Sequence, residues 1–319
     1  MPKYRHDLPQ LKGKIFLTDG GMETTFIFHD GIALPYFASF VLLESEDGRN
    51  RLRAYYRRYL EIARGRDAGF VLEGMTWRAN ADWGEQLGYD ATGLADMNRR
   101  SIAFLDDLRS EWEQPEQPCV ISGSIGPRGD GYKAGLMNSA EAEDYHSAQI
   151  ETLASTEADL VSAYTLTNVD EAVGIARAAR NARMPCMISF TVETDGRLVT
   201  GPSLRDAIET VDRETGGYPA YYMINCAHPT HFEQALEAGE NWMQRIAGVR
   251  ANASTRSHAE LDESETLDAG DPDDLGARYL RLTRKFPTMR ILGGCCGTDH
   301  RHVAAICEAC VPRMAAMSA

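Results

Sequence analysis

The stretch MRILGGCCG, residues 289–297, is a short apolar run that ends in two cysteines flanked by glycines. It is the last of eight β-rich runs in the chain, and longer segments with apolar residues at helical spacing lie between the runs. Several runs are almost continuously apolar, which is typical of parallel strands covered on both faces. The seven earlier runs are KIFLTDGG (14–21), FVLEGMTW (70–77), PCVISGSIG (118–126), ADLVSAYTL (158–166), PCMISFTV (185–192), AYYMINC (220–226) and RIAGVRANAS (245–254).

This alternation of strands and helices predicts an α/β fold, a (β/α)8 TIM barrel in a single domain over residues 14–312. Residues 1–13 then form an N-terminal extension. An open Rossmann sheet fits less well, because no strand is followed by a G-x-G-x-x-G turn that opens a helix. Residues 255–274 are acidic and poor in apolar side chains, so we expect a solvated loop or lid within the barrel.

Composition excludes several classes of partner. The 319 residues are 43% hydrophobic and 25% charged, which is typical of a globular protein with a large core. A formal net charge of -14 gives no long-range attraction to nucleic acid or to anionic lipid. The polar N-terminus lacks the apolar region of a signal peptide, so we expect a cytoplasmic protein that acts on small molecules. Assembly into a homo-oligomer is left open.

Three of the seven cysteines fall where a barrel carries its active site, at the carboxyl ends of strands. Cys226 ends the sixth run, and Cys295 and Cys296 end the eighth. Only one strand separates the sixth run from the eighth, so the ends of these two strands can converge on one ion. Three thiolates with an open fourth position fit a catalytic Zn²⁺. The glycines around the pair allow two adjacent side chains to turn inward.

Other interpretations of the same cysteines remain. A structural zinc would need a fourth ligand, for which His228 and His300 are the candidates. Redox thiols, a disulfide between the adjacent pair, or buried core thiols are further alternatives. Cys307 and Cys310 lie one helical turn apart without a second pair, which favours a structural role.

Five motifs resemble the homocysteine S-methyltransferases, and they occur in the order of that family. They are TDGGMET (18–24), GSIGP (123–127), PSLRDAI (202–208), INC (224–226) and GGCCGT (293–298). The combination of INC and GGCCGT is the specific part. The resemblance implies a barrel enzyme in which Cys226, Cys295 and Cys296 bind zinc, and the zinc binds the thiol of homocysteine.

The chemistry of such a centre indicates its partner. Zinc held by three thiolates keeps a bound substrate sulfur deprotonated and electron-rich, so it suits a cationic methyl donor. We therefore expect methyl transfer from S-methylmethionine or S-adenosylmethionine to homocysteine, giving methionine, without a separate protein nucleophile. Alternatives are the same chemistry with another thiol or with betaine or dimethylsulfoniopropionate as donor, or a non-catalytic zinc or thiol-binding barrel.

The substrate residues follow partly from the resemblance, which implies that Asp19 contacts the amino group of homocysteine. Tyr164 stands where the family has a second acidic residue, and a neutral phenol cannot replace that charge. Arg78 would repel a sulfonium if it faced the pocket, or bind a substrate carboxylate if it reached one. The predicted substrate-binding residues are Asp19, Gly20, Thr76, Trp77, Arg78, Tyr164 and Asn225.

Overall fold

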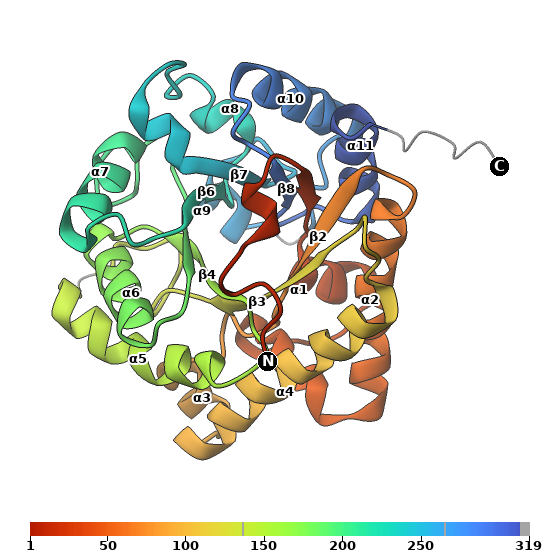
Figure 1. Ribbon diagram of the computed structural model, residues 1–319, viewed down its shortest axis with the longest axis vertical. Helices are drawn as coiled ribbons and strands as arrows, with labels where there is room; N and C mark the ends of the chain where they lie inside the picture. Colours follow the sequence, from red (N-terminus) through yellow and green to blue (C-terminus); the bar gives the residue numbers. More distant parts are fainter. Residues whose placement is uncertain (136, 265, 313–319) are drawn as a thin grey trace.

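The chain forms a closed barrel of eight parallel strands in a computed structural model that describes residues 1–135, 137–264 and 266–312 (Figure 1). The strands pair in chain order, and β1 closes the barrel against β8. The predicted TIM barrel is therefore confirmed. The strands are β1 (Ile15–Leu17), β2 (Ala68–Glu73), β3 (Cys119–Ile125), β4 (Leu160–Leu166), β5 (Cys186–Phe190), β6 (Tyr221–Asn225), β7 (Ile246–Ala251) and β8 (Ile291–Gly294).

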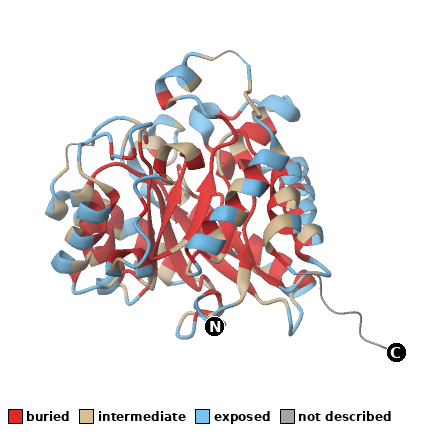
Figure 2. Cartoon of the chain, turned by 90° about the horizontal axis from the view of Figure 1, so that it is seen from above, coloured by how far each residue is buried: buried red, intermediate tan, exposed pale blue. Residues whose placement is uncertain are grey.

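Helices surround the barrel and cover its outer face (Figure 1). The longer ones are α2 (Glu46–Ala63), α4 (Ala91–Trp112), α5 (Ser139–Ala154), α6 (Val169–Asn181), α7 (Leu204–Thr215), α10 (Pro272–Lys285) and α11 (His300–Cys310). Short helices in the loops are α1 (Met22–Thr24), α3 (Ala81–Gln86), α8 (Pro229–Phe232) and α9 (His258–Asp262). Figure 2 shows buried strands at the centre and exposed residues along the outer helical faces, as two-sided burial of a parallel sheet requires.

Helix α7 shows how local sequence sets these elements. Ser203 and Asp206 form a capping box at its start, and Gly216 ends it with a φ of 65°. Both ends thus have residues suited to their backbone conformation. The apolar residues recur at helical spacing and are buried against the barrel: Leu204, Ala207, Ile208 and Val211.

Glycines at the end of β8 allow the close approach that brings the cysteine pair to the barrel mouth. A Cβ atom at Gly293 would overlap the hydroxyl of Thr18 next to β1. A Cβ atom at Gly294 would overlap the hydroxyl of Thr298. No larger side chain fits at either position, so the sequence GG before Cys295 is a packing requirement of barrel closure.

The second predicted run was placed too late in the chain. Strand β2 begins at Ala68 and ends at Glu73, whereas the sequence pattern predicts a run from Phe70 to Trp77. The Gly74 amide still donates to the Ser122 carbonyl at 2.8 Å, and the chain then turns, with the Ala79 amide donating to the Thr76 carbonyl at 2.9 Å. Glu73 is therefore the last residue of the strand, which is where a barrel places functional groups.

The acidic segment 255–274 contains a helix as well as loop. Helix α9 starts at a capping box formed by Ser257 and Glu260. The first residues of α10 also belong to this segment, and residue 265 lies outside the described ranges. Among the described residues, no helix has the length and apolar character needed to cross a membrane.

Candidate metal and substrate site

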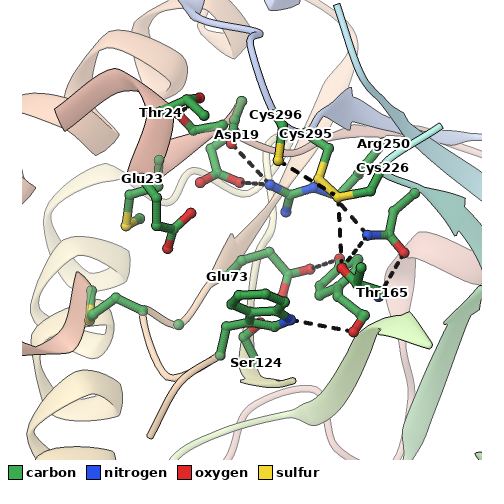
Figure 3. Close-up of a pocket in the computed structure, with 18 of the residues that line it drawn as sticks. Asp19, Glu23, Thr24, Glu73, Ser124, Thr165, Cys226, Arg250, Cys295 and Cys296 are labelled. Atoms are coloured by element: carbon green, nitrogen blue, oxygen red, sulfur yellow. Dashed lines mark hydrogen bonds and ion pairs between the residues drawn. A yellow bond between two sulfur atoms is a disulfide. The ribbon is translucent and has the colours of Figure 1, made fainter. Parts of the chain in front are cut away.

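A cavity of about 100 Å³ opens at the carboxyl ends of the barrel strands (Figure 3). Its walls come from strand ends and from the loops that follow them, the position expected for the active site of this fold. The lining residues that carry chemistry are Asp19, Glu23, Glu73, Trp77, Tyr132, Tyr164, Thr165, Asn225, Cys226, Arg250, Cys295 and Cys296.

The three predicted cysteines meet in this cavity. Their sulfur atoms all lie within 4.8 Å of one another, and the Sγ atoms of Cys226 and Cys296 are 3.9 Å apart. In this structure Cys226 and Cys295 are joined as a disulfide, and Cys296 is a free thiol. The backbone of Cys226 has a φ of 52°, a region that residues with a Cβ rarely occupy and that is enriched at functional sites.

The reduced cluster fits a metal with an open position. Among the described residues, no histidine or carboxylate joins the three sulfur atoms in the group. The predicted alternative ligand His228 instead caps α8, where its Nδ1 atom lies 2.8 Å from the Thr230 hydroxyl. His300 begins α11 and is not part of the cluster either. Three sulfur ligands without a fourth are typical of a catalytic zinc site.

Hydrogen-bond donors lie beside each sulfur atom. The Thr165 hydroxyl donates to Cys226 Sγ at 3.7 Å, and the Asn225 amide lies 3.9 Å from Cys295 Sγ. The Tyr132 hydroxyl is 3.5 Å from Cys296 Sγ. Burial raises the pKa of the Cys296 thiol, and the Tyr132 contact opposes this shift. Donors at all three sulfurs favour their charged form, which is the form that binds metal.

The amide of Asn225 is fixed from both sides. Its oxygen accepts hydrogen bonds from the Thr165 amide at 3.0 Å and from the Ser189 hydroxyl at 2.6 Å. Its nitrogen donates to the Thr165 hydroxyl at 2.9 Å. The register of β4 against β5 shifts here, and Thr165 has a φ of 63°. This irregularity points Thr165 toward the cysteines, a use of bulges that is common next to active sites.

Asp19 already has a cationic partner. Its Oδ1 atom lies 2.7 Å from Arg250 Nη2, and its Oδ2 atom accepts from the Tyr55 hydroxyl at 3.0 Å. Arg250 also donates to the carbonyls of Gly294, at 3.0 Å, and Gly20, at 3.2 Å. Burial raises the pKa of Asp19, and the Arg250 guanidinium lowers it. The residue expected to bind the substrate amino group is thus held in an internal ion pair.

A second carboxyl group stands beside Tyr164. The Tyr164 hydroxyl donates to Glu73 Oε1 at 2.6 Å, whereas Glu73 Oε2 is buried without a hydrogen-bond partner among the described residues. The Ser122 hydroxyl lies close enough to lower the pKa of this carboxyl group, but its 2.6 Å hydrogen bond is donated to the Ser162 hydroxyl. Burial is the main cause that raises the pKa of Glu73 to about 7, and Arg250 opposes it. Strand β2 therefore supplies a carboxyl group where β4 has a phenol.

The titration of Glu73 predicts a pH dependence of stability. Because the pKa is near 4.5 when the chain is unfolded and about 7 when it is folded, the native state holds this proton more tightly. The stabilisation is complete below the lower pKa and is lost as pH rises through the higher one. The free energy of unfolding of the wild type should therefore fall by about 3 kcal/mol more, as pH rises through this range, than that of Glu73→Gln. Urea unfolding of both proteins at pH 5 and at pH 8 measures it, and equal pH dependences would contradict it.

Five of the predicted substrate residues line the cavity and two do not. Asp19, Gly20, Trp77, Tyr164 and Asn225 are in its wall. Neither Thr76 nor Arg78 is in the wall. The hydroxyl of Thr76 is buried and donates to the Ser124 carbonyl at 2.6 Å.

Arg78 is occupied outside the cavity. Its guanidinium carbon lies 4.0 Å from the centre of the Trp77 ring and 4.2 Å from the centre of the Trp83 ring, and its Nη1 atom donates to the Gly129 carbonyl at 2.8 Å. These contacts hold the charge between two aromatic faces. The structure therefore gives Arg78 neither of the two substrate roles expected for it.

Several cavity residues were not among those predicted: Glu23, Glu73, Tyr132, Thr165 and Arg250. The sequence contained a signal for two of them, because Glu73 and Arg250 are charged residues near the ends of otherwise apolar strands. A charge inside a parallel barrel must be paired or face a cavity, since burial without a partner is costly. Tyr132 lies in a long loop and has no such signal.

Helix α9 brings the acidic segment against the cysteines. The Nε2 atom of His258 is 2.5 Å from the Cys226 carbonyl oxygen, and its Nδ1 atom is 3.2 Å from Glu193. The His258 ring also packs on Tyr132, with ring centres 4.4 Å apart. The segment expected as a solvated loop or lid thus has a buried anchor next to the site.

Comparisons with known proteins show the family and agree with the fold. Selenocysteine Se-methyltransferase from Brassica oleracea var. italica is 23% identical, over 96% of this chain and 92% of that protein. Homocysteine S-methyltransferase 2 from Arabidopsis thaliana is 22% identical over 96% of each. The metallated form of the homocysteine methyltransferase MmuM from Escherichia coli has the same fold, with a TM-score of 0.72, 19% identity and coverage of 95% of this chain and 98% of that one. Residues 16–310 match the family described as homocysteine S-methyltransferase, and the chain belongs to that family.

Proposed function

We propose that this methyltransferase uses zinc, held by Cys226, Cys295 and Cys296, to move a methyl group from a sulfonium donor to the thiol of homocysteine. The observation that carries the proposal is the cluster of three sulfur atoms without a fourth protein ligand, in a cavity at the strand ends. The metallated form of the MmuM relative supports it, because that protein has the same fold. When bound, zinc would keep the acceptor sulfur deprotonated and ready to attack a methyl group.

The chain itself supplies positioning. Tyr132, Thr165 and Asn225 hold the cysteine sulfurs in place from three sides. Asn225 is the best fixed of them, since it bonds to both β4 and β5. A rigid set of ligands keeps the acceptor sulfur in one place, and correct placement of two reactants lowers the barrier to a bimolecular step.

The donor would meet aromatic and anionic groups. Trp77 lines the cavity, and its indole nitrogen donates to the Tyr164 carbonyl at 3.3 Å, which fixes the ring. An aromatic face attracts a cation by about 0.5–2 kcal/mol. Glu23 is a second attractive group in the wall, with its Oε1 atom held by the Ser39 hydroxyl at 2.8 Å. Both groups favour S-methylmethionine or S-adenosylmethionine over an uncharged donor.

The experiment is a donor and acceptor panel on reduced, zinc-loaded protein. S-methylmethionine, S-adenosylmethionine, betaine and dimethylsulfoniopropionate are each mixed with homocysteine, with selenocysteine or with a simple thiol, and the methylated product is measured by mass spectrometry. We expect methionine from homocysteine and a sulfonium. Product only with another thiol or with betaine would favour the alternative substrates, and no product with any pair would favour a non-catalytic barrel.

A further inference from the structure

We propose that Glu73, positioned by Tyr164, binds the ammonium group of the α-amino thiol acceptor. This inference rests on the proposed function, because it concerns the substrate of the same site. It assigns to β2 a role that the resemblance would give to β4, where this chain has Tyr164 in place of an acidic residue.

Among the described residues, Glu73 is the one acidic residue of the cavity wall with a buried carboxyl oxygen that has neither a hydrogen bond nor an ion pair. Asp19 is paired with Arg250 and also accepts from Tyr55. Glu23 accepts a hydrogen bond from Ser39 and is only partly buried. Glu73, in contrast, is 5% exposed, and its Oε2 atom has no partner. Leaving a buried carboxyl oxygen without a hydrogen bond costs free energy, so the Glu73 Oε2 atom is suited to accept a hydrogen bond from a ligand.

The surroundings of Glu73 indicate which chemical group of a ligand would bind to it. Because Arg250 is paired with Asp19, the charge of Glu73 is not neutralised by a direct ion pair among the described residues. A cationic ligand group would supply that charge. An ammonium also brings three N–H donors, whereas a sulfonium has none and cannot satisfy the free oxygen. S-methylmethionine and S-adenosylmethionine also carry an ammonium group, but Glu73 shares its cavity with the three sulfur atoms that would hold the acceptor thiol, so we assign the acceptor's ammonium to it.

Tyr164 has a positioning role in this arrangement. Its hydroxyl holds Glu73 Oε1 at 2.6 Å, and its ring lies over the Arg250 guanidinium at 5.1 Å. One carboxylate oxygen is thereby fixed, and the other is left for the ligand. In Figure 3 the Glu73 side chain reaches into the same cavity as the three sulfur atoms, so one short molecule can contact both with its thiol and its amino group.

The test compares homocysteine with 4-mercaptobutyrate, which has the same chain without the amino group. Binding to reduced, zinc-loaded protein is measured by calorimetry at pH 8, above the pKa of about 7 for Glu73. We expect the wild type to bind homocysteine about 10- to 100-fold more tightly, the range for a hydrogen-bonded charged group. Glu73→Gln should reduce this preference to about threefold or less, and Glu73→Asp should restore part of it.

Glu23→Gln is the matched control, because it removes a charge from the same cavity without touching the Glu73 and Tyr164 pair. We expect it to keep the preference for homocysteine. Equal binding of the two thiols by the wild type would overturn the inference, as would binding of neither. An equal loss for both thiols in Glu73→Gln, or loss of the preference in Glu23→Gln, would also contradict it. If the preference holds but no donor gives product, the proposed function fails and the role of Glu73 stands.

Discussion

Cys226→Ser is expected to bind less than about a tenth of the zinc that the reduced wild type binds and to lose methyl transfer by about 100-fold or more. A serine hydroxyl stays protonated at neutral pH, so it cannot replace a thiolate ligand. The two remaining cysteines are adjacent and would hold the metal from one strand end only. Loss of a direct ligand should exceed the 10- to 100-fold effect that is typical of groups behind the ligands.

The measurement is metal content by mass spectrometry after reduction, zinc loading and desalting. Reduction matters because Cys226 and Cys295 are joined as a disulfide in this structure, and a disulfide does not serve as a thiolate ligand. Cys310→Ser is the matched control, since Cys310 is a partly buried thiol on α11 whose sulfur lies 4.0 Å from the Thr283 hydroxyl, outside the cluster. Full zinc content in Cys226→Ser, or none in the reduced wild type, would refute the assignment.

The barrel could be predicted because burial on two faces leaves a clear pattern. Runs such as PCMISFTV and AYYMINC are mostly apolar and carry no charged residue, and helices separate them. The end of β2 was harder to predict, because Gly74 and Met75 continue the apolar pattern after the strand has ended at Glu73. Where a strand stops is set by its neighbours in the sheet, which a single run of sequence does not describe.

The cysteines could be predicted because strand order alone brings the ends of β6 and β8 close together. Side-chain direction could not. Arg78 follows β2, as an active-site residue would, yet two tryptophan rings hold its guanidinium outside the cavity. Glu73 lies five residues earlier and faces inward. Pairings such as Glu73 with Tyr164 depend on rotamers and distances between strands, and no local pattern records them.

Arg250→Met is expected to destabilise the fold by about 3–5 kcal/mol, the range for removing one partner of a buried ion pair. Asp19 is 2% exposed, so its carboxylate would lose its counter-ion without gaining water. Two backbone carbonyls, those of Gly20 and Gly294, would also lose a donor. Arg205→Met is the matched control: this arginine forms an exposed pair with Glu209 one turn along α7, and its loss should leave stability close to that of the wild type.

Two measurements show whether Arg250→Met destabilises the fold through the lost charge or through the lost packing: its pH dependence, and a double variant. Burial raises the pKa of Asp19, and the Arg250 guanidinium partly offsets this shift. The pKa of Asp19 should therefore be higher still in Arg250→Met, which favours the protonated carboxyl group. Since a raised native pKa adds stability at low pH that is lost as pH rises, the deficit of Arg250→Met should be larger at pH 8 than at pH 5. In the double variant with Asp19→Asn neither charge is left unpaired, so its loss should be smaller than the sum of the single losses by about 0.5–3 kcal/mol. Urea unfolding of the four proteins measures both effects, and strictly additive losses that do not change with pH would show that Arg250 acts through packing alone.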